Sequence, residues 1–461
     1  MEMSFDFNPY YPKQLLSPSV SSYRHNRWVF IAFAISILFL AYAIDRSNFG
    51  QVVLGYALAF YAYYYWIEKR HFRTAKAIFS QALIIRLLLL LAVPKLSDDY
   101  FRFIWDGLIQ VNGLNPFASL PSEVEGTSDY MQGLMDQMNS PDYYSVYPPI
   151  MQGVFYAISA LVGENTMAQL IAMRVILIAA DMGVIWVGIK ILRMLKRPIS
   201  NVSLYALNPL VIVELIGNLH FEGLMLFFTL SGIYFLMRML KESKAWLVLP
   251  GTVLIASGVL TKIVLLLSLP ALWRRWGAPK TAGIGILTLV FCVAGFALYV
   301  DIPMIHHMGQ SLDLYFRNFE FNASIYSLTR TIAYEWIPYY TSAAIGPYVT
   351  GVMILGILSL TFLRKAERFE GFFETLLFIL SVYLLFASTV HPWYIVNLVA
   401  VSLFTQYRYP IVWSFVVVVS YFMYANDLIE VGWMIGLEYL VVLGYFIYEM
   451  KNIRSNRIHD Q

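Results

Sequence analysis

The sequence contains few charged residues and almost no cysteine. Asp, Glu, Lys and Arg together make up 13% of its 461 residues, whereas hydrophobic residues make up 59%. A soluble globular domain carries about 25% charged residues, so the composition excludes that class. The one cysteine, Cys292, cannot form an internal disulfide, and cysteine pairing therefore gives no information about the compartment.

The sequence also lacks the short motifs of soluble nucleotide and metal sites. It contains no Walker motif, no GxGxxG, no Cys/His metal set and no nucleophile elbow. A soluble nucleotide-sugar donor therefore has no recognisable binding domain. The net charge of +3 is close to balance, which argues against nucleic acid as a partner. We also expect no cleavable signal peptide, because the first apolar segment is too long for an h-region.

Long apolar segments dominate the rest of the chain. Stretches of about 17 residues or more can cross a bilayer as helices. They predict an all-α polytopic membrane protein, in which residues 1–461 form a single membrane domain of about 13–15 segments. The predicted segments are 28–44, 51–67, 77–93, 148–163, 168–190, 201–216, 221–238, 245–261, 263–273, 281–300, 341–363, 371–388, 393–405, 410–424 and 431–449.

Clusters of Lys and Arg between the segments predict the orientation, because such clusters stay on the cytoplasmic side. They are Lys13/Arg24/Arg27, Lys69/Arg70/Arg73/Lys76, Arg193/Lys196/Arg197, Arg238/Lys241/Lys244, Arg274/Arg275/Lys280, Arg364/Lys365/Arg368, Arg408 and Lys451/Arg454. The loop 94–147 then lies outside, and it carries eight acidic residues against Lys95 and Arg102. If all the basic clusters are cytoplasmic, segments 148–163 and 168–190 together must cross the membrane only once. One of the two is therefore expected to be re-entrant or to lie flat.

Nearly all the unusual polar residues fall on the predicted outer side. They lie in the loop 94–147, in 217–223, at Thr261-Lys262, in the loop 301–338 and in 389–394. A secondary transporter more often places charged groups near the bilayer midplane between inverted repeats, and no such repeat is visible. Clustering on one side predicts a site at the outer interface.

A few charged residues lie inside the predicted segments instead. Arg174 and Asp181 are seven residues apart, which is two turns on one helix face. We expect them to pair with each other or with neighbours, and Arg86 likewise. Arg174 and Asp181 are also the only charged groups at a depth that a transporter would use.

The stretch from Asp98 to Gly107 is the most unusual element, because two adjacent carboxylates follow directly on an apolar run. Such groups are costly at a membrane edge and usually mark chemistry. On a helix, Arg102 is four residues from both Asp98 and Asp106, so the three side chains share one face. The stretch is either an interfacial helix with a solvated acidic edge, or it holds a general base or a metal site. A divalent metal is possible there but not required, and we expect no other cofactor.

The acidic loop ends in an aromatic group, Tyr143, Tyr144 and Tyr147, directly before Pro148-Pro149. Proline is favoured at the first position of a helix, so the group is consistent with a simple helix start that has interfacial tyrosines. The functional alternative is that these rings stack on a sugar.

A second polar group follows Asn208-Pro209, which breaks the segment 201–216. Glu214, Asn218, His220 and Glu222 lie within nine residues at an outer helix junction. His220 alone could be an interfacial histidine that bonds only to the backbone. Four polar side chains at one junction favour a site.

Two further elements carry cations near the same interface. Lys262 lies between two apolar runs, where it either extends to the interface or meets a lipid phosphate. His391-Pro392-Trp393-Tyr394 is either a turn in an aromatic belt or a place where His391 donates to a phosphate oxygen.

Five motifs, taken in order along the chain, resemble the GT-C integral-membrane mannosyltransferases. They are SDDYFRFIWDG…NGLNPF, YPPIMQGVF, NPLVIVELIGNLHFEGLML, LTKIVLLLSLP and HPWY. These enzymes use polyprenyl-phosphate-mannose and include bacterial α-mannosyltransferases and, more distantly, the catalytic subunit of GPI mannosyltransferase I. The resemblance covers roughly residues 77–405. It implies a GT-C fold, a catalytic carboxylate in a large first outer loop, and transfer at the outer face. Glu222 stands where the family more often has Asp.

The predicted function is inverting transfer of a mannosyl residue from polyprenyl-phosphate-mannose to an acceptor hydroxyl. Asp98 or Asp99 is the predicted general base, and the donor phosphate is assigned to Lys262, His391 and Arg102. Residues predicted to contact the sugar or the acceptor are Asp106, Tyr143, Tyr144, Tyr147, His220, Glu222, Trp393 and Tyr394.

Two alternatives remain open at the level of sequence. The first is a lipid or sugar flippase or secondary transporter, and the second is an enzyme of the same fold that uses another lipid-linked sugar. The acceptor is a glycan, a glycolipid or a protein, and membrane lipids surround the bundle. We expect a multi-pass protein of the bacterial inner membrane with its site facing the periplasm, or the ER lumen in a eukaryote.

Overall fold

The computed structural model describes residues 20–68, 74–299, 304–307, 309–311, 319–336, 342–426 and 431–459. Within these ranges the chain is helical and contains no strand, and one backbone bridge joins Phe321 to Thr389. The predicted all-α architecture is confirmed. Four of the predicted cytoplasmic cations, Lys13, Lys69, Arg70 and Arg73, lie outside the described residues.

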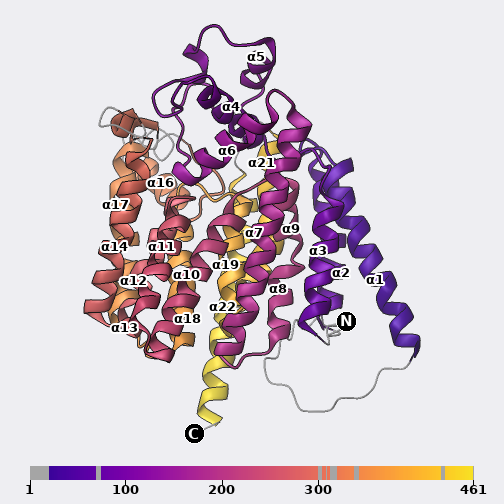
Figure 1. The fold of residues 1–461 in the computed structure, drawn as a ribbon. Helices are drawn as coiled ribbons and strands as arrows, with labels where there is room; N and C mark the ends of the chain where they lie inside the picture. Colours follow the sequence, from indigo (N-terminus) through magenta and orange to yellow (C-terminus); the bar gives the residue numbers. More distant parts are fainter. Residues whose placement is uncertain are drawn as a thin grey trace.

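The helices follow the predicted apolar segments closely (Figure 1). The longer α-helices are α1 Val20–Leu38, α2 Phe49–Glu68, α3 Ala75–Leu88, α4 Asp99–Val111, α6 Pro149–Val162, α7 Thr166–Met194, α10 Glu222–Glu242, α11 Val248–Val259, α14 Ala278–Ala297, α16 Ile325–Trp336, α17 Ser342–Leu363, α18 Phe369–Phe386 and α22 Gly432–His459. The shorter ones are α5 Asp129–Met135, α8 Ser203–Ala206, α9 Pro209–Ile212, α12 Ser268–Ala271, α13 Trp273–Trp276, α19 Ile395–Ser402, α20 Tyr409–Val416 and α21 Tyr421–Ala425. The 3₁₀ and π turns are η1 Phe39–Ala43, η2 Pro121–Glu123, η3 Ile199–Val202, η4 Val213–Gly217, η5 Ala245–Leu247, η6 Ile263–Leu267, η7 Pro392–Tyr394 and η8 Val417–Ser420.

Six helices in the described ranges, α7, α10, α14, α17, α18 and α22, are long and apolar enough to cross a membrane. The bent stretch from η3 to η4 makes a seventh if it counts as one span. This number is below the 13–15 predicted segments. Several of those segments form apolar helices of only 10–17 residues, and 263–273 divides into η6, α12 and α13. Apolar content alone does not separate a crossing helix from a shorter one.

The lengths of α6 and α7 bear on the single crossing that the charge pattern requires of segments 148–163 and 168–190. It has 14 residues, about 21 Å at 1.5 Å per residue, whereas α7 has 29 residues. Figure 1 shows α6 beside α4 and α5 at one end of the bundle, while α7 runs along it. Of the two helices only α7 is long and apolar enough to cross a membrane, which agrees with the single crossing that the charge pattern predicts.

Close packing fixes α4 on α6. The rings of Phe103 and Phe155 stack with their centroids 4.9 Å apart. A Cβ at Gly107 would lie 2.5 Å from the carbonyl oxygen of Phe155, so a glycine is needed for this approach. The helix that begins at the two aspartates is consequently held on a rigid support.

The predicted break at Asn208-Pro209 is present. The Asn208 side chain accepts from the backbone N–H groups of Leu210 and Val211 and so caps α9, in which Pro209 takes the first position. The two halves of the span are bent by 56°. The second half ends in the π-turn η4, which leads into the loop that carries His220.

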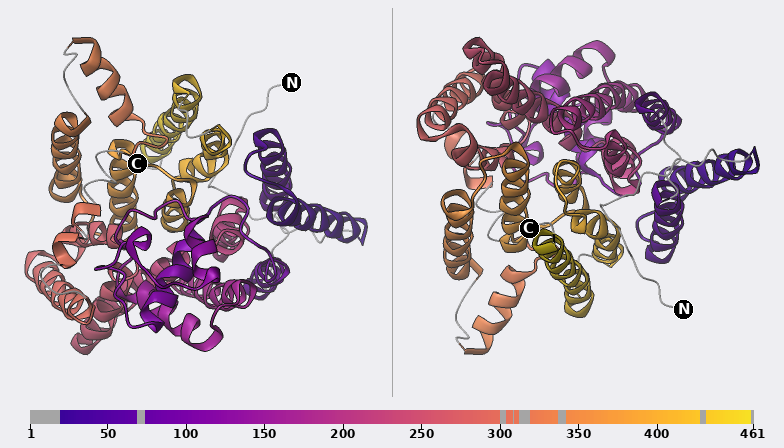
Figure 2. Two further views of the ribbon diagram at one scale, coloured as in Figure 1. Left: turned by 90° about the horizontal axis from the view of Figure 1, so that it is seen from above. Right: turned by 90° about the horizontal axis from the view of Figure 1, so that it is seen from below.

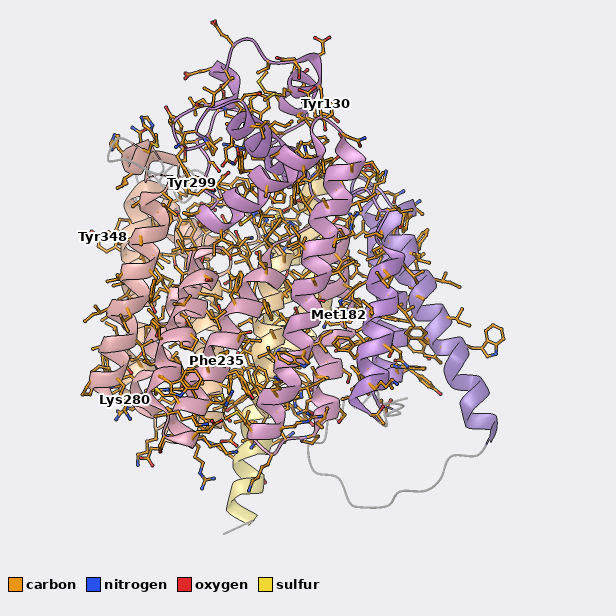
Figure 3. All side chains as sticks on the ribbon, in the orientation of Figure 1. Tyr130, Met182, Phe235, Lys280, Tyr299 and Tyr348 are labelled. Carbon is orange, nitrogen blue, oxygen red and sulfur yellow. The ribbon has the colours of Figure 1, made fainter. Side chains whose placement is uncertain are left out.

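The bundle has a buried half and an open half. Of the candidate spans, α7 and α10 are 67% buried, whereas α14 and α17 are 17% and 22% buried. Viewed along the bundle, α1 and α2 lie at one edge (Figure 2). Lys280, from a predicted cytoplasmic cluster, lies at the end opposite Tyr130 of the loop 94–147 (Figure 3). The two ends therefore carry the residues that the charge pattern assigned to opposite sides.

Buried charges inside the bundle pair with neighbouring helices, which is one of the two arrangements expected from the sequence. Asp181 forms its ion pair with Arg86 rather than with Arg174, and the Tyr205 hydroxyl donates to the same carboxylate. Arg174 instead donates to the carbonyl oxygens of Ile216, at 2.7 Å, and Leu90, at 2.9 Å. Neighbouring helices, and not the same helix face, supply the partners.

Candidate active site

A cavity of about 760 Å³ opens at the end of the bundle where α4 begins. All the predicted site residues except Asp106 and His220 line it: Asp98, Asp99, Arg102, Tyr143, Tyr144, Tyr147, Glu222, Lys262, His391, Trp393 and Tyr394. They come from α4, the end of the loop 94–147, α10, the α11–η6 junction and η7. Elements that are far apart in the sequence thus converge on one site.

The two aspartates have different surroundings. Asp98 precedes the first residue of α4 and forms an ion pair with Arg46, which lies between η1 and α2. Burial raises the pKa of Asp98, although the charge of Arg46 opposes this shift. The Asp98 side chain is 29% exposed and faces the cavity.

Asp99 is more firmly ionised than Asp98. Its Oδ1 accepts from Asn139 Nδ2 at 3.2 Å, and its Oδ2 lies 3.7 Å from His220 Nε2. Burial alone would raise the pKa of Asp99, but the neighbouring His220 outweighs it and holds the pKa at about 2. Asp99 is therefore a carboxylate across the whole physiological pH range.

Lys262 and Glu222 form an ion pair on another wall of the cavity. Glu222 is the first residue of α10, and its side chain is 1% exposed, whereas Lys262 is 22% exposed. The buried carboxylate compensates the ammonium group, and the exposed part of Lys262 faces the cavity.

His391 and His220 lie on the two faces of Trp393. The Trp393 ring centroid is 4.3 Å from that of His391 and 3.8 Å from that of His220. The hydroxyl of Tyr424 lies 2.7 Å from His391 Nδ1. Burial lowers the pKa of His391 to about 3, so this ring is neutral at pH 7. A neutral imidazole can still donate one hydrogen bond.

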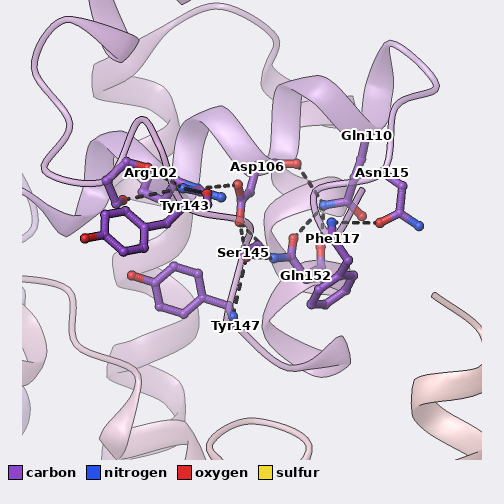
Figure 4. A network of polar contacts seen from close by, with 10 residues as sticks. Arg102, Asp106, Gln110, Asn115, Phe117, Tyr143, Ser145, Tyr147 and Gln152 are labelled. Carbon is purple, nitrogen blue, oxygen red and sulfur yellow. Dashed lines mark hydrogen bonds and ion pairs between the residues drawn. The ribbon is translucent and has the colours of Figure 1, made fainter. Parts of the chain in front are cut away.

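Arg102 and Asp106 hold the loop against α4 (Figure 4). Arg102 Nε donates to Asp106 Oδ1 at 2.7 Å, and its Nη1 donates to the carbonyl oxygen of Tyr143 at 2.9 Å. Asp106 Oδ2 accepts from Ser145 Oγ at 2.6 Å and from Gln152 Nε2 at 2.8 Å. Asp106 is fully buried below the cavity wall. The position predicted for a sugar contact is thus occupied by a buried anchor of the loop.

The three predicted tyrosines form part of the cavity wall. Tyr147 packs edge-on against Phe103, with centroids 5.1 Å apart. Tyr144 stacks on His307 at 4.3 Å. The rings of Tyr144 and Tyr147 are therefore held by other aromatic groups.

The sequence analysis did not identify several residues of the site. Arg46 had one signal, because Asp45-Arg46 is a charged pair in a short connection between the first two apolar segments. Asn139 and Tyr424 gave none, since an amide or a tyrosine at an interface is common. The apolar part of the cavity wall comes from Ile263, Val264, Leu380, Tyr383 and Leu384. Among the described residues no group of three His, Cys, Asp or Glu side chains is arranged to hold a metal ion.

Comparison with known proteins supports a relationship over the half of the chain that contains most of this site. A family model described as "Alpha-(1->6)-mannopyranosyltransferase, N-terminal domain" matches residues 24–278. A probable alpha-(1->6)-mannopyranosyltransferase of Mycolicibacterium smegmatis is 26% identical over 254 residues, which are 48% of this chain and 45% of the relative. An alpha-(1->6)-mannopyranosyltransferase of Mycobacterium tuberculosis is 28% identical over 155 residues, or 32% of this chain and 25% of the relative.

Alpha-(1->6)-mannopyranosyltransferase B of Corynebacterium glutamicum is 28% identical over 151 residues, or 32% of this chain and 24% of the relative. The chain spans less than half the length of each of these curated relatives. No solved structure matches it. Because the family model covers more than half of the residues, the chain belongs to the alpha-(1->6)-mannopyranosyltransferase family.

Proposed function

We propose that the protein transfers a mannosyl residue, with inversion at C1, from polyprenyl-phosphate-mannose to an acceptor hydroxyl. The observation that carries this proposal is the arrangement of one cavity. It has a pair of carboxylates on one wall, a lysine and a histidine on another, and an apolar wall beside them. Family membership supports the mannosyl group as the unit that is transferred.

In the proposed step the acceptor oxygen attacks C1 of the mannosyl group from the side opposite the phosphate. The C1–O bond to the phosphate breaks as the new C1–O bond forms, and the polyprenyl phosphate leaves with the electron pair. The proton of the acceptor hydroxyl goes to Asp98 or Asp99. Asp98 has the higher pKa of the two and so the stronger tendency to accept a proton. A base in this position contributes about 10²–10⁴-fold to the rate.

The leaving phosphate gains negative charge during this step. Lys262 carries a positive charge on the cavity wall, and His391 can donate a hydrogen bond beside it. Both groups stabilise the leaving oxygen. Arg102 stiffens this region through its bonds to the loop, so its predicted phosphate contact is the weakest of the three.

The apolar wall gives the isoprenoid chain a place to bind. Ile263 and Val264 lie in η6, and Leu380 and Leu384 lie on the same cavity from α18. A lipid chain along these side chains would remain in the bilayer while its phosphate reaches Lys262. This arrangement explains why a donor of this kind needs no soluble nucleotide-binding domain.

The acceptor and the membrane side are part of the same proposal. The names of the relatives specify an α-(1→6) linkage, which suggests a mannoside 6-hydroxyl as the acceptor. The predicted orientation places the reaction at the outer face, because the basic clusters lie at the other end of the bundle. Inversion to an α product requires a β-linked donor.

The experiment uses the purified full chain in lipid nanodiscs, with radiolabelled β-linked polyprenyl-phosphate-mannose and an α-mannoside acceptor. Asp98→Asn and Asp99→Asn keep the shape of each side chain and remove its charge. At least one of them is expected to lose transfer by 100-fold or more. Asp136→Asn is the matched control, because Asp136 is an exposed carboxylate of the same loop that does not line the cavity.

Wild-type transfer by both variants would show that the carboxylates do not act as the base. A protein that moved the labelled lipid across the bilayer without forming a glycoside would be a flippase instead. Retained configuration in the product would contradict a single inverting step.

A further inference from the structure

A buried carboxylate lies behind Asp99, with His220 between them. Glu214 belongs to η4 and is fully buried. Its Oε1 accepts from the hydroxyls of Tyr421 and Tyr56 and from Asn218 Nδ2. Its Oε2 lies 3.0 Å from His220 Nδ1. Glu214 therefore contacts His220 and Asn218 of the polar group that the sequence places at this junction.

The contacts of His220 define where its protons lie. Nδ1 is 3.1 Å from the carbonyl oxygen of Glu214 and 3.0 Å from its carboxylate. Both groups only accept hydrogen bonds, so Nδ1 carries a proton. Nε2 is on the side of Asp99, with 3.7 Å between Nε2 and Oδ2. A proton on Nε2 as well makes the ring an imidazolium between two carboxylates.

The aromatic contact also favours the charged ring. His220 stacks on Trp393 with an interplanar angle of 20° and a centroid distance of 3.8 Å. A cation over an indole face is attracted by the ring quadrupole. His391, on the other face of Trp393, contacts a tyrosine hydroxyl and is neutral. The two histidines of this stack therefore differ in charge.

Charged groups face His220 from three elements, and the neutral groups of η7 cover another side. Asp99 comes from α4, Glu214 from η4 and Glu222 from α10, and Lys262 compensates Glu222. His391 lies beyond the indole. Burial alone would lower the pKa of His220, but the carboxylates outweigh it and raise the pKa to about 9.

The backbone around His220 is held in an unusual conformation. Leu219 has φ 62°, in the left-handed region that residues other than glycine rarely adopt. Arg174 donates to the carbonyl oxygens of Ile216 and Gly217 at the end of η4. Strain of this kind persists only where the surrounding contacts fix it, and it is commonly found at functional sites. The position of His220 is thus set by its surroundings.

We propose that Glu214 is a positioning residue of this site: it keeps His220 as an imidazolium, which in turn holds Asp99 as an oriented carboxylate at the cavity. The inference rests on the proposed function, because it concerns how the carboxylate pair is prepared for transfer. Asp99 either takes the acceptor proton or stabilises the positive charge that develops at C1. Both uses need an ionised side chain in a fixed position. Glu214 does not line the cavity, so in this proposal it acts through its contact with His220.

The first test is an NMR titration of histidine ring signals in the wild-type protein. The chain has seven histidines, and the His220 signal is identified by its loss in His220→Asn. We expect His220 to titrate near pH 9. Titration at or below about 6.5, the value of an unperturbed histidine, would overturn the proposal without any variant of Glu214.

The second test is Glu214→Gln, which keeps the backbone carbonyl contact and removes the charge. The His220 titration is expected to move down by at least about one pH unit. The alkaline limb of the kcat profile moves with the His220 titration, so a downward shift of one pH unit lowers kcat at pH 8.5 about fourfold relative to its value at pH 6.5. KM for the lipid donor stays unchanged, because Glu214 does not line the cavity.

Tyr421→Phe is the matched control. Its hydroxyl bonds to Oε1 of Glu214 and not to the oxygen beside His220. This variant is expected to keep both the titration and the alkaline limb of the wild type. A Glu214→Gln protein with wild-type titration and profile would refute the role of Glu214. Failure of the proposed function would give a different result. Asp98→Asn and Asp99→Asn would then both remain active, whatever the pH at which His220 titrates.

Discussion

Two buried ionic clusters of this protein obey the same electrostatics and have different surroundings. In the first, Arg86, Asp181 and Tyr205 lie inside the bundle, with the ion-paired side chains fully buried. In the second, Asp99 and Lys262 retain exposures of 21% and 22% and face a cavity, while their partners His220 and Glu222 are buried. A buried charge is tolerated only when a partner offsets the loss of hydration. The first cluster holds helices together, whereas the second leaves charge available to a ligand.

The largest expected effect separates activity from stability in the open cluster. Asp99→Asn should lower transfer by ~10²–10⁴-fold, because the ionised carboxylate is lost from the cavity. Its free energy of unfolding should change less than that of Asp181→Asn, since Asp99 is partly exposed and His220 keeps Glu214 as a second partner. Transfer assays and thermal unfolding of the same preparation measure both. An Asp99→Asn protein that fails to fold would place Asp99 with the structural cluster.

The opposite outcome is expected in the closed cluster. Asp181→Asn leaves the buried Arg86 without its counter-charge and should lower the free energy of unfolding by about 3–5 kcal/mol. Yield and unfolding in detergent report this loss, and Tyr205→Phe, which keeps the ion pair, should cost less. A stable but inactive Asp181→Asn protein would remove the distinction between the two clusters.

The stability of the open cluster should also depend on alkaline pH. The pKa of His220 is raised to about 9 in the folded protein, so its contribution is fully present below about pH 6.5 and is lost as pH rises towards 9. The integrated effect is about 3 kcal/mol. The free energies of unfolding of the wild type and of His220→Asn, each measured at pH 6.5 and 9.5, isolate this contribution. Equal pH dependence in the two proteins would contradict the charged state of His220.

The smallest expected effect concerns the donor phosphate. Lys262→Met should lower kcat/KM for the lipid-linked donor by roughly 10- to 100-fold, through loss of a charged contact. It also leaves Glu222 buried and unpaired, so the double variant Lys262→Met/Glu222→Gln is needed. The double variant should regain stability and remain impaired towards the donor. Recovery of both the stability and the kcat/KM for the donor would mean that Lys262 only compensates the charge of Glu222.

Local sequence patterns predicted much of this structure. The apolar segments form helices because a helix satisfies its own backbone hydrogen bonds within the segment. Asn208 and Pro209 break one of them because a cap and a proline act on the adjacent residues. The elements around Asp98, Lys262 and His391 meet in one cavity, as one-sided clustering of polar residues predicted.

Tertiary structure decided which charges meet. Asp181 is 95 residues from Arg86 and only seven from Arg174, yet packing of α3 against α7 gives it the distant partner. The buried places of Asp106 and Glu214, and the contact of Arg46 with Asp98, are equally non-local. Sequence alone determined the helices and the end of the bundle at which polar residues gather, since both follow from neighbouring residues and hydropathy. The pairing of carboxylates with cations depends on which helix faces come together, and only the folded chain fixes that.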